Sequence, residues 1–296
     1  MEKNRRIYAL GFFDGVHLGH QALLRSCREL AGRAGIQAGV VTFAAHPDTL
    51  VLGQTPALIN TPADRERLLR GYGMDGVITL PFDDNMRSMP WEAFLRLLME
   101  KYRAAGFVCG ADFRFGHRGQ GNARLLGQFC RDGGIPFDAV PEQTLDGIRV
   151  SSTHIRALLE AGEMEAAVRF LGHPHVLSGP VVSGRHLGRT LGIPTANLAL
   201  PEGILVPRFG VYACLAHTDG GTFPAVTNVG IRPTVAGHHV TVEPWLLDFD
   251  ADLYGREITL EFYKFLRPEK KFPTLEALRE EILKNAREVR NFFGNP

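Results

Sequence analysis

The chain has 296 residues, of which 45% are hydrophobic and 22% charged, and its formal net charge at pH 7 is +1. This length favours two domains, and the composition is that of a globular protein, which argues against a disordered or fibrous chain. The near-neutral charge argues against a positive field that would attract polynucleotides, so we expect no nucleic-acid partner.

The cysteines and the first residues of the chain bear on its location. The four cysteines are scattered and form no CxxC pair, which argues against a structural zinc site or a disulfide framework. The N-terminal residues MEKNRRIYAL lack the apolar stretch of a signal peptide, and no segment approaches the roughly 18 apolar residues of a membrane span. We therefore expect a cytoplasmic protein that does not bind membranes.

Apolar runs and helical patterns alternate through the first half of the chain. Residues 7–10 form a short apolar run, residues 19–34 have helical spacing, and residues 36–43 are rich in β-branched side chains, which predicts a β-α-β beginning. Further strands are predicted at residues 76–80, 107–109 and 135–140, and further helices at residues 91–105, 123–131, 152–161 and 163–171. This alternation predicts a doubly wound α/β domain.

The pattern changes after residue 171, where the sequence GHPHVLSGP ends the helical spacing. Strands are predicted at residues 176–182, 210–217, 223–231, 240–249 and 256–266, which together indicate a small antiparallel β-barrel. Residues 274–292 have the pattern of a C-terminal helix with Thr274 as its N-cap. We therefore predict one domain over residues 1–173 and a second over residues 174–296.

The segment GFFDGVHLGHQ places His17 and His20 three residues apart where the first strand ends and the first helix begins. Gly11, Gly15 and Gly19 let the backbone pass close to a bulky anion, and the helix N-terminus adds unpaired N–H groups and a partial positive charge. The segment therefore suits a triphosphate, whose α-phosphate the imidazoles could stabilise by hydrogen bonds as charge builds on its oxygens.

Two other interpretations of this HxGH segment follow from its residues. Two histidines near a helix start are often only surface polar residues, and a four-residue pattern recurs by chance. A zinc site is less favoured, because no HExxH motif or cysteine partner lies nearby.

Two later segments have the character of ligand loops. Residues 110–119 follow a predicted strand, end in a Gly-rich turn and carry Asp112 and Arg118. Ser152 and Thr153 offer hydroxyl groups at a helix start, and Arg156 follows one turn later, a geometry suited to phosphate oxygens. For Ser152, a plain helix N-cap is an equal alternative.

The barrel half opens with a second candidate site. Gly184, Gly188 and Gly192, spaced four residues apart, could wrap phosphates, although Gly-rich loops are common. In the sequence PTAN, the Thr195 hydroxyl and the Asn197 amide oxygen could share a hard cation such as Mg²⁺, with a local side-chain turn as the alternative.

An acidic residue interrupts the apolar run at residues 240–249. Glu243 lies there among Val242, Trp245 and Leu246. It could pair with Arg or Lys at the edge of the core, or, with a raised pKa, it could act as the general base for a primary hydroxyl.

The ordered set GFFDGVHLGHQ, TFAAHP, GADFRFGHRGQG and VSSTHIRALL resembles the FMN adenylyltransferase module of bacterial bifunctional riboflavin kinase/FAD synthetases, which belong to the HxGH nucleotidyltransferases. The resemblance covers most of residues 7–172 and implies that His17 and His20 stabilise the phosphates of ATP. Phe12 stands where the family usually has Asn. The resemblance also implies that Asp112 helps to hold the nucleotide or the flavin and that Ser152, Thr153 and Arg156 close over the phosphates. The full set of binding residues that it implies is Gly11, Phe13, Asp14, Gly15, Gly19, Asp112, Arg118, Ser152, Thr153 and Arg156.

The run GRTLGIPTANL, FGVYA, TNVGIRPTV, VEPWLLDFDADLYGREITLEF and FLRPEKKF resembles the riboflavin kinase module over residues 177–273. It implies that Thr195 and Asn197 hold Mg²⁺ with ATP and that Glu243 deprotonates the ribityl 5′-hydroxyl. Pro244 and Trp245 depart from the more usual small residue and His after the glutamate. The nucleotide-loop residues that it implies are Gly184, Gly188 and Arg189.

The two resemblances together imply an enzyme that phosphorylates riboflavin to FMN and adenylylates FMN to FAD, with ATP as co-substrate and Mg²⁺ as cofactor. One alternative is a single-activity nucleotidyltransferase with a regulatory flavin-binding barrel. The other is a non-enzymatic flavin-binding or RNA-binding protein, which would leave HxGH and PTAN without a purpose.

Overall fold

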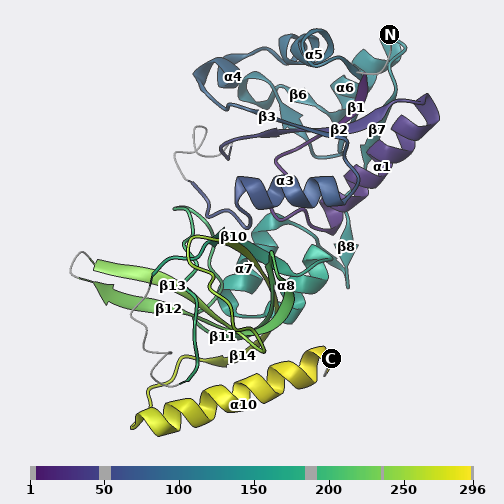
Figure 1. Ribbon diagram of the computed structural model, residues 1–296. Coiled ribbons are helices and arrows are strands. Elements are labelled where there is room, and N and C mark those ends of the chain that lie inside the picture. Colours follow the sequence, from purple (N-terminus) through teal and green to yellow (C-terminus); the bar gives the residue numbers. More distant parts are fainter. Residues whose placement is uncertain (1–4, 47–54, 184–191, 235–236, 295–296) are drawn as a thin grey trace. The chain divides into compact units, whose positions relative to one another are not determined.

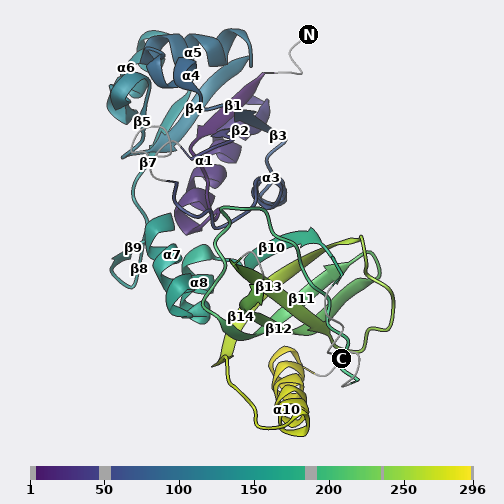
Figure 2. The same ribbon diagram turned by 90° about the vertical axis from the view of Figure 1, so that its left-hand side faces the viewer.

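The computed structural model describes residues 5–46, 55–183, 192–234 and 237–294. The chain divides into two compact units (Figures 1 and 2). The first consists of Met1–Leu58 and Pro62–Ser152, and the second of Ile59–Thr61 and Thr153–Pro296.

A parallel five-stranded sheet in the order β3-β2-β1-β4-β7 forms the centre of the first unit. Its strands are β1 (Arg6–Leu10), β2 (Gln37–Phe43), β3 (Gly76–Leu80), β4 (Ala104–Gly110) and β7 (Phe137–Val140). The strand order reverses between β1 and β4. In sheets of this kind, ligands bind at the carboxyl ends of the strands on either side of that reversal.

Helices cover both faces of this sheet (Figure 1). The apolar cores show it directly, because neighbouring residues of β1 point to opposite faces. Ile7 packs in a buried cluster with Leu24 of α1 (Leu18–Ala34) and Leu69 of α3 (Pro62–Gly71). Tyr8 packs in another with Leu95 of α5 (Trp91–Glu100) and with α6 (Ala123–Asp132). The predicted doubly wound α/β architecture is confirmed.

Several short elements complete the first unit. They are α4 (Asp84–Ser88), β5 (Arg114–Phe115), the 3₁₀ turn η1 (His117–Gly119), β6 (Gly121–Asn122), β8 (Thr144–Leu145) and β9 (Ile148–Arg149).

The helix predicted over residues 91–105 is wrong at its end. It stops at Glu100, Arg103 takes a left-handed conformation with φ 57°, and β4 begins at Ala104. Alanine favours helices, but the strand that begins at Ala104 is hydrogen-bonded to β1, and this pairing outweighs the local helix preference of Ala104 and Ala105.

An antiparallel sheet in the order β10-β14-β11-β12-β13 forms the second unit. Its strands are β10 (His175–Pro180), β11 (Gly210–Thr218), β12 (Gly221–Thr234), β13 (Gly237–Leu246) and β14 (Glu257–Pro268). Leu198 forms antiparallel bridges both to Val181, just after β10, and to Val242 in β13. The segment around Leu198 therefore links the two edge strands, as the predicted barrel requires.

The helices described in this unit include α7 (Ser152–Ala161), α8 (Met164–Leu171) and α10 (Leu275–Phe293). The predicted cap of α10 is confirmed, because the Thr274 hydroxyl accepts a hydrogen bond from the Ala277 amide at 3.1 Å. Ala286 and Val289 of α10 pack against Val211 and Val226 of the barrel.

Helices α7 and α8 belong to the same compact unit as the barrel, because the boundary between the two units lies between Ser152 and Thr153. The domain boundary between residues 173 and 174, just after α8, stays a prediction about which part of the chain folds independently. No helix in the part of the chain that the structure describes is long and apolar enough to cross a membrane.

Candidate functional site

A cavity of about 370 Å³ lies in the first unit at the carboxyl ends of β1 and β4, where the strand order reverses. The start of α1 and residues 149–152 complete its walls. Six of the residues predicted for a nucleotide site line this cavity: Gly11, His17, Gly19, His20, Asp112 and Ser152.

The two histidines of the HxGH motif stack at the start of α1. Their ring centroids lie 3.7 Å apart with an interplanar angle of 13°, and the His20 amide donates to Nδ1 of His17 at 3.3 Å. Nδ1 of His20 is buried without a hydrogen-bond partner among the described residues. Burial lowers the pKa of His20 well below its usual value, and the adjacent His17 and Arg65 lower it further. His20 is therefore a neutral imidazole near pH 7, next to the positive end of a helix.

The glycine turn before α1 requires unusual backbone conformations. Gly15 has φ 81°, and Phe13 and Val16 also have positive φ angles of 62° and 39°. The Phe13 side chain is fully buried in the core on the side of the sheet that α1 covers, and it does not line the cavity. It therefore packs under the turn and does not contact a ligand. A Cβ atom at Gly19 would lie 3.1 Å from the His17 ring, so a side chain there would crowd that imidazole.

Ser152 joins this turn to the start of α7. Its hydroxyl donates to the backbone carbonyl of Asp14 at 2.9 Å. Asp14 itself is only 2% exposed and is not among the lining residues. The structure thus brings two motifs together that are 138 residues apart in sequence.

Asp112 also lines the cavity and forms an ion pair with Arg149 at 2.5 Å. Arg149 also pairs with Glu142 at 2.9 Å, and both of these residues line the cavity. Arg149 was not predicted from the sequence, because it lies in the two-residue strand β9 and no local pattern indicates that it pairs with Asp112.

Arg118 is exposed on the turn η1 and is not among the lining residues of this cavity. Thr153 and Arg156 belong to the second unit, on α7, and their part in the nucleotide site stays a prediction.

In the second unit, the PTAN segment runs antiparallel beside β13. The Ala196 amide donates to the Pro244 carbonyl and the Leu198 amide to the Val242 carbonyl, each at 2.9 Å. This register places Asn197 opposite Glu243.

Thr195 and Glu243 both line a cavity of about 300 Å³ between the barrel and α10. Trp245 and Phe272 supply aromatic surface to it, and Arg267 lies at its wall with Nε 3.0 Å from Oδ1 of Asn285. The remaining lining residues are the apolar Ile193, Val211, Val226, Leu278 and Ile282 and the polar Asn228, Glu269 and Lys270.

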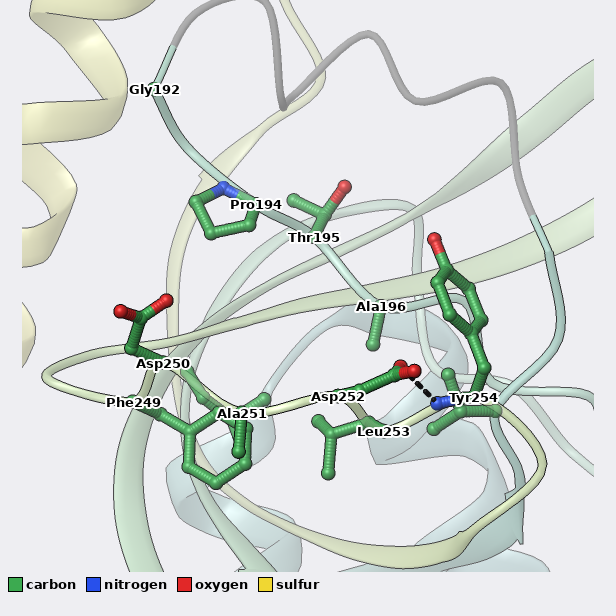
Figure 3. A pocket seen from close by; sticks show the side chains of 12 residues that line it. Gly192, Pro194, Thr195, Ala196, Phe249, Asp250, Ala251, Asp252, Leu253 and Tyr254 are labelled. Carbon is green, nitrogen blue, oxygen red and sulfur yellow. Dashed lines mark hydrogen bonds between the residues drawn. The ribbon is translucent and has the colours of Figure 1, made fainter.

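Thr195 also lines a second, more polar cavity of about 490 Å³. Figure 3 shows the segment from Gly192 to Ala196 facing the loop from Phe249 to Tyr254, where the Tyr254 amide donates to Asp252 at 2.9 Å. Thr195 therefore lies at the junction of two cavities. The predicted residues Gly184, Gly188 and Arg189 lie outside the described residues.

Comparison with known proteins finds a match for each of the two halves of the chain. A family model described as FAD synthetase matches residues 1–154, and one described as riboflavin kinase matches residues 171–293. The chain is 33% identical to the bifunctional riboflavin kinase/FMN adenylyltransferase of Listeria monocytogenes, over 98% of this chain and 93% of the relative. It belongs to the bifunctional riboflavin kinase/FMN adenylyltransferase family.

Other members of the family match over nearly the same extent. The protein from Pseudomonas fluorescens is 38% identical, over 93% of this chain and 89% of the relative, and that from Escherichia coli K12 is 36% identical, over 97% and 93%. A crystal structure described as a macrolide-efflux protein from Streptococcus pneumoniae has a TM-score of 0.87 at 28% identity and covers 98% of both chains.

Membership of this family confirms the resemblance predicted from the motifs and the presence of both enzyme modules. The alternative of a single-activity nucleotidyltransferase with a regulatory barrel is not favoured, because the riboflavin kinase model matches the barrel itself.

Proposed function

We propose that the second unit phosphorylates riboflavin to FMN and that the first unit transfers the adenylyl group of ATP to FMN, giving FAD and pyrophosphate. The observation that supports this most strongly is that each unit has its own cavity lined by the residues its chemistry needs. His17 and His20 line one, and Thr195 and Glu243 line the other.

In the adenylyl transfer, a phosphate oxygen of FMN attacks the α-phosphorus of ATP, and the bond to the β-phosphate oxygen breaks as pyrophosphate leaves. No covalent enzyme intermediate is needed, so the unit contributes orientation and charge stabilisation. His17 and His20 lie at the N-terminus of α1, where ring and backbone N–H groups can stabilise the growing negative charge on the phosphate oxygens.

In the kinase reaction, the Glu243 carboxylate accepts the proton of the ribityl 5′-hydroxyl while that oxygen attacks the γ-phosphorus of ATP, and ADP leaves. The apolar 300 Å³ cavity suits the flat isoalloxazine ring, since Trp245 and Phe272 offer aromatic faces. The more polar 490 Å³ cavity suits the nucleotide. Thr195, which both cavities share, would then lie where hydroxyl and γ-phosphate meet.

Thr195 and Asn197 have the chemistry to hold a magnesium ion, because a hydroxyl and an amide oxygen are hard ligands that Mg²⁺ accepts. Thr195 lines both cavities, whereas Asn197 lines neither and lies opposite Glu243 in the register of the two segments. When bound, the ion would neutralise phosphate charge.

The four cysteines are all free and buried, which fits a reducing compartment, so we place both reactions in the cytoplasm.

Incubation with ATP, Mg²⁺ and either riboflavin or FMN tests the proposal, with the flavins separated by chromatography. We expect riboflavin to yield both FMN and FAD, and added FMN to yield FAD alone. If riboflavin gives FMN but neither flavin gives FAD, the proposed adenylyl transfer is contradicted. If FMN gives FAD but riboflavin is not converted, the proposed kinase reaction is contradicted.

A further inference from the structure

Arg65 is a buried cation behind the wall of the adenylyl-transfer cavity. It lies in the first turns of α3, is only 2% exposed, and is among the largest fully buried side chains of the described chain. A guanidinium group in such a place is costly unless its surroundings compensate its charge or the charge has a use.

The contacts of Arg65 lead directly to the cavity. Its Nη2 donates to the backbone carbonyl of Phe43 at 2.8 Å, and its Cζ lies 4.4 Å from the centre of the Phe12 ring. Phe12 and Phe43 both line the cavity that holds His17 and His20. Nη1 of Arg65 is buried and has no hydrogen-bond partner among the described residues, so one donor of this cation is left unused.

The charges around Arg65 belong to the same site. Burial lowers the pKa of Arg65, and the carboxylate of Asp14 in the glycine turn opposes that effect. In return, the charge of Arg65 adds to burial and to His17 in lowering the pKa of His20. Asp112, Arg114, Glu142 and Arg149 also line this cavity, where Arg149 is paired with both Asp112 and Glu142, whereas Arg65 is a cation buried behind the lining residues Phe12 and Phe43.

We propose that Arg65 is a positioning residue of the adenylyl-transfer site, which holds the Phe12 ring in the cavity wall and places a fixed positive charge behind the reacting phosphates. The inference rests on the adenylyl transfer proposed for the first unit. A charge of this kind needs no reorganisation during the reaction, and low local polarity increases its effect on the anionic phosphates. It also favours the neutral form of His20.

The test compares Arg65→Gln with Arg65→Lys and with Arg70→Gln as a matched control. Gln keeps a neutral hydrogen-bond donor but carries no charge, whereas Lys keeps the charge. Arg70 lies on the same helix, but its side chain is 52% exposed and pairs with Glu66. With FMN and ATP as substrates, we expect kcat/KM for FAD formation to fall about 10–100-fold in Arg65→Gln and less than about 5-fold in Arg65→Lys, with no change in Arg70→Gln.

A second measurement does not depend on catalysis. The pKa of His20 can be followed by NMR of histidine-labelled protein, with its signal assigned through its absence in His20→Asn. We expect this pKa to rise in Arg65→Gln and to stay close to that of the parent protein in Arg70→Gln. Riboflavin phosphorylation by the same preparations should be unchanged, which distinguishes a local effect from general unfolding.

Equal losses of FAD formation in Arg65→Gln and Arg65→Lys, or an unmoved His20 pKa, would overturn the proposal. If Arg65→Gln does not fold, Phe12→Leu decides, since it removes the ring under the guanidinium group and should lower FAD formation about 3–10-fold. Unchanged FAD formation in that variant would overturn the positioning role. Absence of FAD formation in the parent protein would instead contradict the proposed function itself.

Discussion

Asn197 lies opposite Glu243, in a register fixed by two hydrogen bonds of 2.9 Å between the PTAN segment and β13. The same segment links the edges of the barrel through Leu198. The proposed metal ligand and the proposed base are therefore held by the backbone ladder that closes the barrel, so their spacing is set by the fold and not by a mobile loop.

His20→Ala should abolish most FAD formation while leaving FMN formation nearly intact. His20 lines the cavity of the first unit, whereas Thr195 and Glu243 lie in the second. Loss of one group that stabilises the phosphate charge should cost about 10²–10³-fold in turnover. Both products can be measured in one chromatographic assay. An equal fall in FMN formation by a folded variant would mean that the two reactions do not use separate sites.

The C-terminal fragment that carries the kinase site should fold on its own, and its stability should show where the domain begins. Phe170 and Leu171 of α8 are buried, and the Arg208 amide donates to the Leu159 carbonyl of α7 at 2.9 Å. Residues 153–296 should therefore give a fragment that phosphorylates riboflavin and melts at a higher temperature than residues 174–296.

Equal melting temperatures for the two fragments would support the predicted boundary at residues 173 and 174. A soluble and folded fragment over residues 153–296 without kinase activity would show that the kinase site is not complete within this unit.

The order of elements in both units could be predicted from the sequence, because apolar periodicity records which face of each strand or helix is buried. The pairing of His17 and His20 could be predicted too, because side chains three residues apart at the start of a helix lie on the same side of it. The partnerships Asp112–Arg149 and Asn197–Glu243 depend on tertiary register, which no local pattern encodes.

Arg65 was missed for a different reason. The helix α3 was not predicted, although Thr61 followed by Pro62 has the character of an N-cap and first helical residue. Even if α3 had been predicted, its charged residues would have been assigned to the face exposed to solvent, because charged residues are seldom fully buried.

Replacement of His175 should reduce the loss of stability at acidic pH. His175 in β10 is fully buried, neither ring nitrogen has a hydrogen-bond partner among the described residues, and burial lowers its pKa to about 3. In the unfolded chain, His175 takes up a proton as the pH falls below about 6.5, whereas in the folded protein it stays neutral down to about pH 3. The free energy of unfolding therefore has its full value above pH 6.5 and falls as the pH drops toward 3. The loss corresponds to roughly 5 kcal/mol at most.

The measurement is the melting temperature between pH 7.5 and pH 4.5 for the parent protein and His175→Leu. We expect a shallower decline in the variant, which replaces two unsatisfied polar atoms by an apolar group of similar size. Some decline should remain, since the pKa of His20 is also lowered by burial. Parallel curves would show that His175 is not the group responsible.

Riboflavin binding should quench the fluorescence of Trp245. This indole lines the apolar cavity together with Glu243 and stands where the family more usually has His. Stacking on the flavin should also aid binding, so Trp245→Ala should raise KM for riboflavin about 3–10-fold with a smaller effect on kcat. Trp91, which is partly buried against the core of the first unit, is the internal control, because Trp91→Phe should leave most of the quenching in place.

Glu243→Gln should stop riboflavin phosphorylation and spare the adenylylation of added FMN. A primary alcohol is a poor nucleophile near neutral pH, so a positioned base should contribute roughly 10²–10⁴-fold. The amide keeps the shape of the side chain and removes its basicity, while orientation of the γ-phosphate supplies much of the remaining rate. If Glu243 instead only stabilises the barrel, the variant should melt at a lower temperature while its folded fraction turns over riboflavin normally. Melting temperature and kinase turnover measured on one preparation separate the two roles, and near-normal turnover would remove Glu243 from the reaction.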